Sequence, residues 1–181
     1  MPNIETKNLL LLTFTAYAME KVLSGVQELE INETKYAFAK GWPIDVYKNL
    51  FEYKIHRFRE HPNEEEFEGI IINKKHNLII GDMGFKGGPT EQGSMEIGYS
   101  IVPSFQGRGF ATEMGQAAIE WGFNQNGVKK IEATCSIYNK ASIRVLEKIG
   151  LKKWKTDMEK HYWELPNQST FKNHFENNQE G

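Results

Sequence analysis

Residues 96–112 of this 181-residue chain read EIGYSIVPSFQGRGFAT and carry the clearest signals of local structure in the sequence. Its first part alternates as a strand should: from residue 94 to 102, every second side chain is apolar. These apolar side chains are Met95, Ile97, Tyr99 and Ile101. A turn with two glycines follows, and apolar residues then recur at helical spacing to about residue 125. The stretch therefore predicts a strand, a glycine turn and a helix in direct succession.

The turn has the chemistry of an anion site. Gly107 and Gly109 lack the Cβ atoms that would block an approaching ligand, and a helix start leaves several backbone N–H groups without partners. The same helix end carries a partial positive charge, so a pyrophosphate fits it through backbone hydrogen bonds. For Arg108, a phosphate contact and a solvent-facing position both remain open.

Two other nucleotide motifs fit the turn poorly. A Walker A loop requires Gly-Lys followed by Ser or Thr, whereas Gly109 is followed by Phe110 and Ala111. A dinucleotide fingerprint requires a third glycine in a βαβ unit, whereas Thr112 stands there in a chain that we expect to be mostly antiparallel. The sequence therefore favours neither nucleotide hydrolysis nor dinucleotide binding.

Outward from this stretch, hydrophobic spacing and turn residues predict an α+β order. We expect strands at 8–14, 67–73, 78–85, 94–102, 130–137, 151–156 and 160–165, and helices at 16–26, 45–58, 109–125 and 140–149. The second helix should carry an apolar stripe of Val46, Leu50, Tyr53 and Phe58. The last helix has Asn139 at the N-cap position and Gly150 at its C-terminal end.

Two motifs together resemble the GNAT family of N-acetyltransferases. Residues 106–111, QGRGFA, fit its acetyl-CoA signature, and residues 139–151, which begin NKAS and end LEKIGL, look like its later helix. The residues EIGY at 96–99, before the turn, and the Asn-x-x-Ser pattern of Asn139 and Ser142, after it, resemble the branch that includes the ribosomal-protein N-terminal acetyltransferases. The resemblance implies one GNAT-type α+β domain at residues 1–166, a mostly antiparallel twisted sheet flanked by helices, and a loosely ordered tail at 167–181.

The resemblance also implies acetyl-CoA as co-substrate. Strand residues would pair with the pantetheine amides, the turn would hold the pyrophosphate, and an asparagine would face the thioester end. The positions concerned are Ile101, Val102, Gln106, Gly107, Arg108, Gly109, Ala111, Thr112 and Asn139. The strand of Glu96 should splay from the next strand and leave a cleft for the acetyl group.

Direct transfer needs a neutral amine, so a group must accept a proton. The resemblance points to Glu96 as general base; the alternative is an ion-paired strand residue. The leaving thiolate also needs a proton. Leu146 stands where many relatives have a tyrosine, so Ser142 is the predicted donor and Tyr138 the alternative. A helix-capping or packing role for Ser142 is equally open.

Composition excludes several function classes. The net charge of −2, with no long basic run, argues against a nucleic-acid partner. No apolar stretch approaches the roughly 20 residues that cross a bilayer, and the histidines show no metal-site spacing, so we expect no membrane partner and no metal. Cys135 should be a small buried strand residue rather than a nucleophile, and with one cysteine we expect a cytoplasmic location.

The predicted function is transfer of the acetyl group from acetyl-CoA to a primary amine, a protein N-terminus or a small molecule, in a ternary complex. The alternative is a non-catalytic acyl-CoA-binding module, which the leucine at position 146 favours. Three aromatic residues, Tyr36, Phe38 and Trp42, should pack in the core or else line the acceptor pocket. Many members of the family form homodimers, although the sequence itself shows no interface.

Overall fold

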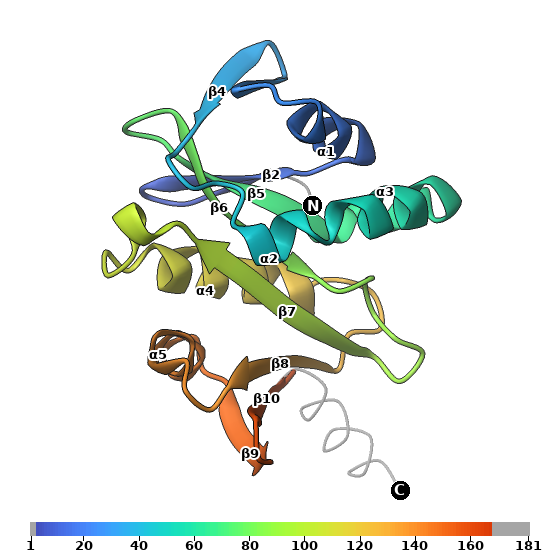
Figure 1. The fold of residues 1–181 in the computed structure, drawn as a ribbon. Helices are drawn as coiled ribbons and strands as arrows, with labels where there is room; N and C mark the ends of the chain where they lie inside the picture. Colours follow the sequence, from blue (N-terminus) through green and yellow to red (C-terminus); the bar gives the residue numbers. More distant parts are fainter. Residues whose placement is uncertain (1–2, 168–181) are drawn as a thin grey trace, which may run out of the picture.

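A ten-stranded mixed sheet runs through the computed structural model, which describes residues 3–167 (Figure 1). Its strands are β1 (Ile4–Glu5), β2 (Leu9–Thr13), β3 (Glu28–Ile31), β4 (Thr34–Phe38), β5 (Glu68–Asn73), β6 (Leu78–Phe85), β7 (Ser94–Ile101), β8 (Lys130–Ser136), β9 (Lys152–Thr156) and β10 (Lys160–Pro166). The spatial order is β1-β2-β5-β6-β7-β8-β10-β9, and the β3–β4 hairpin joins β6 through β4. Most pairs are antiparallel, so the predicted fold class is confirmed.

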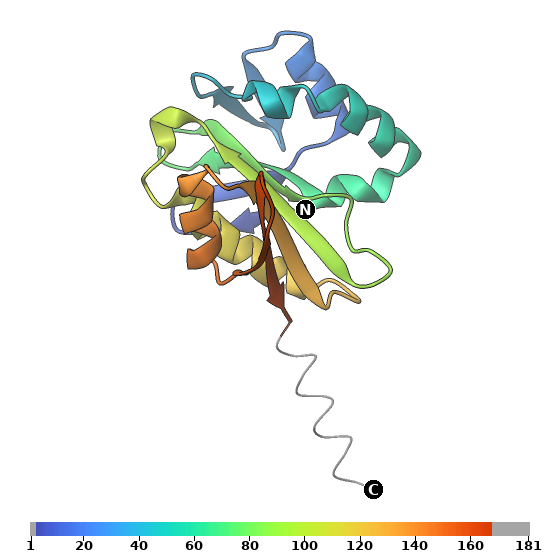
Figure 2. The same cartoon turned by 60° about the horizontal axis from the view of Figure 1, so that its bottom comes forward.

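Helices cover both faces of the sheet (Figure 2). They are α1 (Ala16–Leu23), α2 (Asp45–Lys48), α3 (Phe51–Glu60), α4 (Phe110–Phe123) and α5 (Lys140–Lys148), with short 3₁₀ turns at Pro62–Phe67 and Pro103–Phe105. Helices α1, α2 and α3 lie on one side, and α4 and α5 lie on the other. Because both faces are covered, every residue of β5 is buried, and so is nearly all of β6.

The strands β7 and β8 part from each other, as predicted. Their parallel pairing runs only from Ser94 opposite Lys130 to Glu96 opposite Glu132. Beyond that point β7 pairs only with β6, while β8 pairs with β10 (Figure 1). The carboxyl-terminal half of β7 therefore leaves one backbone edge free of a strand partner, next to the start of α4.

The predicted apolar stripe on residues 45–58 is wrong in register. The segment forms two helices, and three of the four stripe residues are exposed: Val46 (77%), Leu50 (45%) and Tyr53 (63%). The face that packs on the sheet consists instead of Tyr47, Phe51, Ile55 and Phe58. The break between the helices, at residues 49–50, changes the helical phase that a single continuous helix would keep.

The β3–β4 hairpin was not predicted from the sequence. Its turn residues Asn32 and Glu33 both have positive φ angles, 49° and 61°, a geometry that usually calls for glycine. Asn32 suits the first of these positions, but because glutamate rather than glycine follows it, the hairpin signal is weak. Within the core, Tyr36 and Trp42 are buried, which confirms core packing for these two aromatic residues.

The predicted tail begins one residue too early. Asn167 is buried, its backbone N–H donates to the Lys129 carbonyl (2.7 Å), and its side chain donates to the Val128 carbonyl (3.1 Å). This residue therefore belongs to the folded domain. The rest of the predicted tail, residues 168–181, lies outside the described residues.

Candidate functional site

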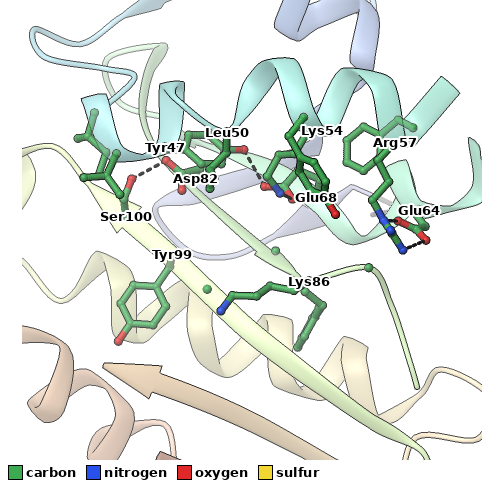
Figure 3. A pocket seen from close by; sticks show the side chains of 18 residues that line it. Tyr47, Leu50, Lys54, Arg57, Glu64, Glu68, Asp82, Lys86, Tyr99 and Ser100 are labelled. Carbon is green, nitrogen blue, oxygen red and sulfur yellow. Dashed lines mark hydrogen bonds and ion pairs between the residues drawn. The ribbon is translucent and has the colours of Figure 1, made fainter. Parts of the chain in front are cut away.

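Two cavities meet at the free edge of β7. The first, about 540 Å³, lies against the glycine turn and α5, and we call it the turn cavity. The second, about 700 Å³, lies between α2–α3 and the β6–β7 strands, and we call it the helix cavity (Figure 3). Ile44, Tyr99 and Ser100 line both cavities. A ligand in one cavity can therefore reach a ligand in the other at these residues.

The start of α4 forms one end of the turn cavity. Glu113 makes the first intrahelical bond, to the carbonyl of Gly109, and no residue within 3–167 accepts a hydrogen bond from the N–H groups of Phe110, Ala111 or Thr112. Gly109 has φ +81°, and a Cβ placed there would meet no atom within 4 Å. The same holds for Gly107 at φ +73°. The donors and the open space together fit an anion such as a pyrophosphate.

The other predicted turn and strand positions differ in what they can offer. The Gln106 amide donates to the Ile101 carbonyl (2.7 Å) and so fixes the turn to the end of β7, and both residues line the turn cavity. Val102 does not line it; this residue is fully buried and its N–H donates to the Ile80 carbonyl (2.9 Å). The backbone N–H of Val102 is therefore not available for the predicted pairing with pantetheine.

Arg108 lies beside the turn rather than in the cavity. Its guanidinium donates to the Ser104 carbonyl (2.9 Å) and stacks over the Phe105 ring at 5.1 Å from the centroid. The side chain is exposed, which fits the solvent-facing alternative. A phosphate contact by Arg108 remains a prediction.

The start of α5 places the Ser142 hydroxyl next to Tyr99 of β7, which lines both cavities. The Asn139 side chain accepts from the Ser142 N–H (3.0 Å) and caps the helix, as expected from its position. The Ser142 hydroxyl lies 3.0 Å from the Tyr99 hydroxyl, and burial raises the pKa of Tyr99 to about 12. The Tyr99 hydroxyl therefore stays protonated at neutral pH, and either hydroxyl of the pair can donate to the other. Tyr138, the alternative donor, is 82% exposed and lines neither cavity.

Glu96 lies where β7 and β8 begin to part. Its carboxylate accepts from the Lys86 ammonium (2.6 Å) and from the Thr134 hydroxyl (2.9 Å), and its side chain is one-third exposed. It lines neither cavity, although its partner Lys86 lines the helix cavity. The structure thus gives Glu96 an ion pair, and its role as general base stays a prediction.

The helix cavity has an apolar wall and a charged floor (Figure 3). The wall includes the exposed side chains of Val46, Leu50 and Tyr53. On the floor, Glu68 accepts from the Tyr47 hydroxyl (2.7 Å) and pairs with Lys54, and nearby Arg57 pairs with Glu64. Asp82, deeply buried, accepts a hydrogen bond from the Ser100 hydroxyl.

Several residues of these cavities were not predicted from the sequence. Tyr99 and Ser100 were placed on β7 without a role, and Arg144 and Lys148 line the turn cavity from α5. Asp82 was passed over, although a carboxylate inside the strand sequence LIIGDMGF is itself a signal: a buried charge is costly and needs a reason. Arg144 and Lys148 are four residues apart on α5, so their helical spacing could have shown that they share one face of the helix.

Three further expectations concern Cys135, metal binding and membrane crossing. Cys135 is buried in β8, and its sulfur accepts from the Trp163 indole (3.3 Å). Within residues 3–167, no cluster of three metal-ligating side chains is found. In the same part of the chain, no helix combines the length and apolar character that a bilayer crossing needs.

Comparison with protein families gives one match over most of the chain. A family model described as an acetyltransferase (GNAT) domain matches residues 8–152. Among curated proteins, the chain is 32% identical over 121 residues to the uncharacterized N-acetyltransferase YjdG of Bacillus subtilis, which covers 66% of this chain and 72% of that relative. Further Bacillus relatives match over about half of their length.

Solved structures share the fold. The ribosomal-protein-S5-alanine acetyltransferase from Vibrio fischeri matches with a TM-score of 0.61 and 15% identity, over 93% of this chain and 98% of its own. RimL, a ribosomal L7/L12 alpha-N-protein acetyltransferase solved in complex with coenzyme A, matches with a TM-score of 0.64 and 16% identity, over 91% and 97%. At such identities the likeness concerns the fold alone.

Proposed function

The chain belongs to the GNAT family of acetyl-CoA-dependent N-acetyltransferases, and we propose that it acetylates a primary amine by direct attack in a ternary complex. The observation that carries the proposal is the meeting of the two cavities at Ile44, Tyr99 and Ser100. A donor in the turn cavity and an acceptor in the helix cavity can react there without a covalent enzyme intermediate.

Acetyl-CoA fits the turn cavity by its charge and its shape. The free N–H groups at the start of α4 suit the pyrophosphate, and Arg144 and Lys148 of α5 add positive charge to the same cavity. The carboxyl-terminal edge of β7, which has no strand partner, suits the amides of the pantetheine arm. The thioester then lies near Tyr99 and Ser142, at the junction.

In the transfer, the amine nitrogen attacks the thioester carbon, the carbon–nitrogen bond forms, and the carbon–sulfur bond breaks. The sulfur keeps the electron pair and needs a proton. The Ser142 hydroxyl, hydrogen-bonded to Tyr99, is the donor that we propose. This pair takes the place of the tyrosine that many relatives have at the position of the buried Leu146.

We expect Ser142→Ala and Tyr99→Phe each to lower kcat about 10- to 100-fold, because general acid catalysis contributes on this scale or above it. Acetyl-CoA binding, followed by thermal unfolding, should stay near the wild-type value. Measuring kcat of Tyr138→Phe in the same way decides whether Ser142 or Tyr138 donates the proton. Loss of kcat in Tyr138→Phe with normal rates in Ser142→Ala would reverse the assignment.

The acceptor is expected to carry an apolar group next to its amine. Val46, Leu50 and Tyr53 expose apolar surface into the helix cavity, where such a group can lie against them. Leu50→Gln should raise KM for an apolar amine about tenfold, since roughly 1 to 3 kcal/mol of apolar contact is lost, with kcat little changed. The matched control is Leu23→Gln in α1, which is similarly exposed but outside both cavities. Equal KM values for the two variants would show that the acceptor does not contact Leu50 in the helix cavity.

The experiment that tests the function is amine-dependent release of CoA thiol. The panel comprises peptides with N-terminal Ala or Ser, polyamines, aminoglycosides and 2-phenylethylamine. An enzyme releases thiol with at least one of these, and Glu96→Gln slows the release if Glu96 is the base. A chain that binds acetyl-CoA and releases none would be the non-catalytic module instead. A cytoplasmic location and a homodimer stay predictions.

A further inference from the structure

The helix cavity contains one acidic group that forms no ion pair within the described residues 3–167. Six charged side chains line this cavity, and three acid–base pairs account for all but one of them: Lys54 with Glu68, Arg57 with Glu64, and Lys86 with Glu96, which lies just outside. The remaining one is Asp82. Within residues 3–167, no lysine, arginine or histidine lies within ion-pair distance of its carboxyl group.

A buried carboxyl group without an ion-pair partner is costly for the fold, so its position needs a reason. Asp82 lies on β6 directly opposite Ser100 of β7, and the Ser100 hydroxyl donates to it (Figure 3). Ser100 is one of the three residues that line both cavities. The carboxyl group is thus connected by one hydroxyl to the point where the amine and the thioester meet.

Resting on the proposed function, we propose that Asp82 accepts, through the Ser100 hydroxyl, the proton that the acceptor amine gives up during transfer. As the carbon–nitrogen bond forms, one N–H proton passes to the Ser100 oxygen and the Ser100 proton passes to Asp82. The carbon–sulfur bond breaks at the same centre, and the thiolate takes its proton from Ser142. Charges and protons balance, because Asp82 later returns its proton to water and Ser142 regains one from water.

The two hydroxyl systems point to opposite sides of β7. Ser100 and Asp82 face α2–α3, whereas Tyr99 faces α5 and Ser142 (Figure 3). Alternation along a strand produces this separation directly. The proton acceptor thus lies on the amine side and the proton donor on the thiol side, which direct transfer requires.

The charged and titratable groups around Asp82 set its protonation. Burial raises the pKa of Asp82 to about 8; the hydrogen bond from Ser100 opposes this, the Glu68 carboxylate on β5 adds to it, and Lys54 on α3 opposes it. Tyr47 on α2 lies next to Glu68 and stays protonated, since burial raises its pKa well above the ordinary value. A group that titrates near pH 8 is well matched to proton transfer from an amine.

The first test compares Asp82→Asn with the wild-type chain in thiol release with the amine panel. We expect kcat/KM to fall by about 10² to 10⁴ and the wild-type rise of rate with pH through about 8 to disappear. The acetyl-CoA thermal shift should be unchanged, because Asp82 does not line the turn cavity. Ser100→Ala should also lose the rise of rate with pH through about 8. The matched carboxylate control is Glu28→Gln on the distant β3, which should behave as wild type.

The outcomes separate the inference from the proposed function. If the wild-type chain releases no thiol with any amine, the proposed function falls and the inference with it. If the wild-type chain is active and Asp82→Asn keeps its rate and its pH profile, only the inference falls. If Glu96→Gln removes the rise of rate with pH and Asp82→Asn does not, Glu96 is the proton acceptor and the inference falls.

A second measurement needs no substrate. The folded-state pKa of Asp82 lies above its ordinary value of 3.8, so the stabilisation of the protonated form is complete below pH 4 and is lost as pH rises through about 8. The Tm of the wild-type chain should therefore fall between pH 5 and pH 9 by several degrees more than the Tm of Asp82→Asn. Parallel curves for the two chains would mean that Asp82 is ionised throughout this range, and would overturn the assignment of the rise of rate near pH 8 to Asp82.

Discussion

Replacing Gly109 by leucine should abolish the stabilisation of this chain by acetyl-CoA. The new side chain would project into the open space at the start of α4, where we place the pyrophosphate. Loss of two or three hydrogen bonds to a charged group, each worth roughly 1.5 to 3 kcal/mol, lowers affinity by at least about 100-fold. Thermal unfolding with graded acetyl-CoA measures this as a missing shift in Tm.

The control for this variant lies in the loop that follows α4. Gly127 has nearly the same backbone angle, φ +78° against +81°, and a Cβ at this position would also meet no atom within 4 Å. Gly127→Leu thus carries the same backbone strain outside both cavities. It should lose some stability yet keep the full acetyl-CoA shift. Equal loss of the shift in both variants would mean that strain, rather than blocked binding, explains Gly109→Leu.

Replacing Lys54 by methionine should lower the free energy of unfolding by about 3 to 5 kcal/mol. The Lys54–Glu68 pair is largely buried, with side chains 16% and 8% exposed, and removal of the lysine leaves the Glu68 carboxylate without its cation close to Asp82. Breaking a buried pair in this way has a cost of that size. For a chain of this length the expected fall in Tm is about 10 °C.

An exposed pair provides the comparison. Lys35 and Glu28 lie 2.8 Å apart on the β3–β4 hairpin with side chains 63% and 50% exposed. Lys35→Met should change stability by less than about 1 kcal/mol, because such surface pairs contribute little. Denaturant unfolding of the two variants side by side measures the difference. If both methionine variants lost the same stability, the burial of the Lys54–Glu68 pair would not matter as we describe.

The part of the fold that the sequence predicts well is the part with local signals. The strand, turn and helix of residues 94–125 follow from alternation, two glycines and helical spacing, and Asn139 and Gly150 correctly bound α5. Each of these signals acts within a few residues. The structure therefore agrees with them to within one or two residues at most ends.

The sequence prediction fails where tertiary contacts decide. Residues 45–58 contain apolar residues on more than one side, so spacing alone could not show that Tyr47 and Phe51 face the core while Val46 and Leu50 line a cavity. The exposed apolar residues were interpreted as core. In the structure they are the better clue to function, because a cavity keeps apolar surface open for a ligand.

The candidate site divides in the same way. The glycine turn was predicted from its own residues, and its open N–H groups are what the signature requires. The pairing of Asp82 with Ser100 joins residues 18 positions apart through the β6–β7 register, which no local pattern encodes. Glu96, chosen by resemblance, lies in an ion pair instead of on a cavity wall.

The most direct test of the central claim is amine-dependent release of CoA thiol by the wild-type chain. Acetyl-CoA and one panel amine at a time are mixed with the chain near pH 8, and free thiol is followed together with the acetylated amine by mass. We expect equal amounts of thiol and N-acetylated product, formed most rapidly with an amine that carries an apolar group. Thiol release without acetylated amine, or none with any amine despite a clear acetyl-CoA thermal shift, would contradict direct acetyl transfer by this chain.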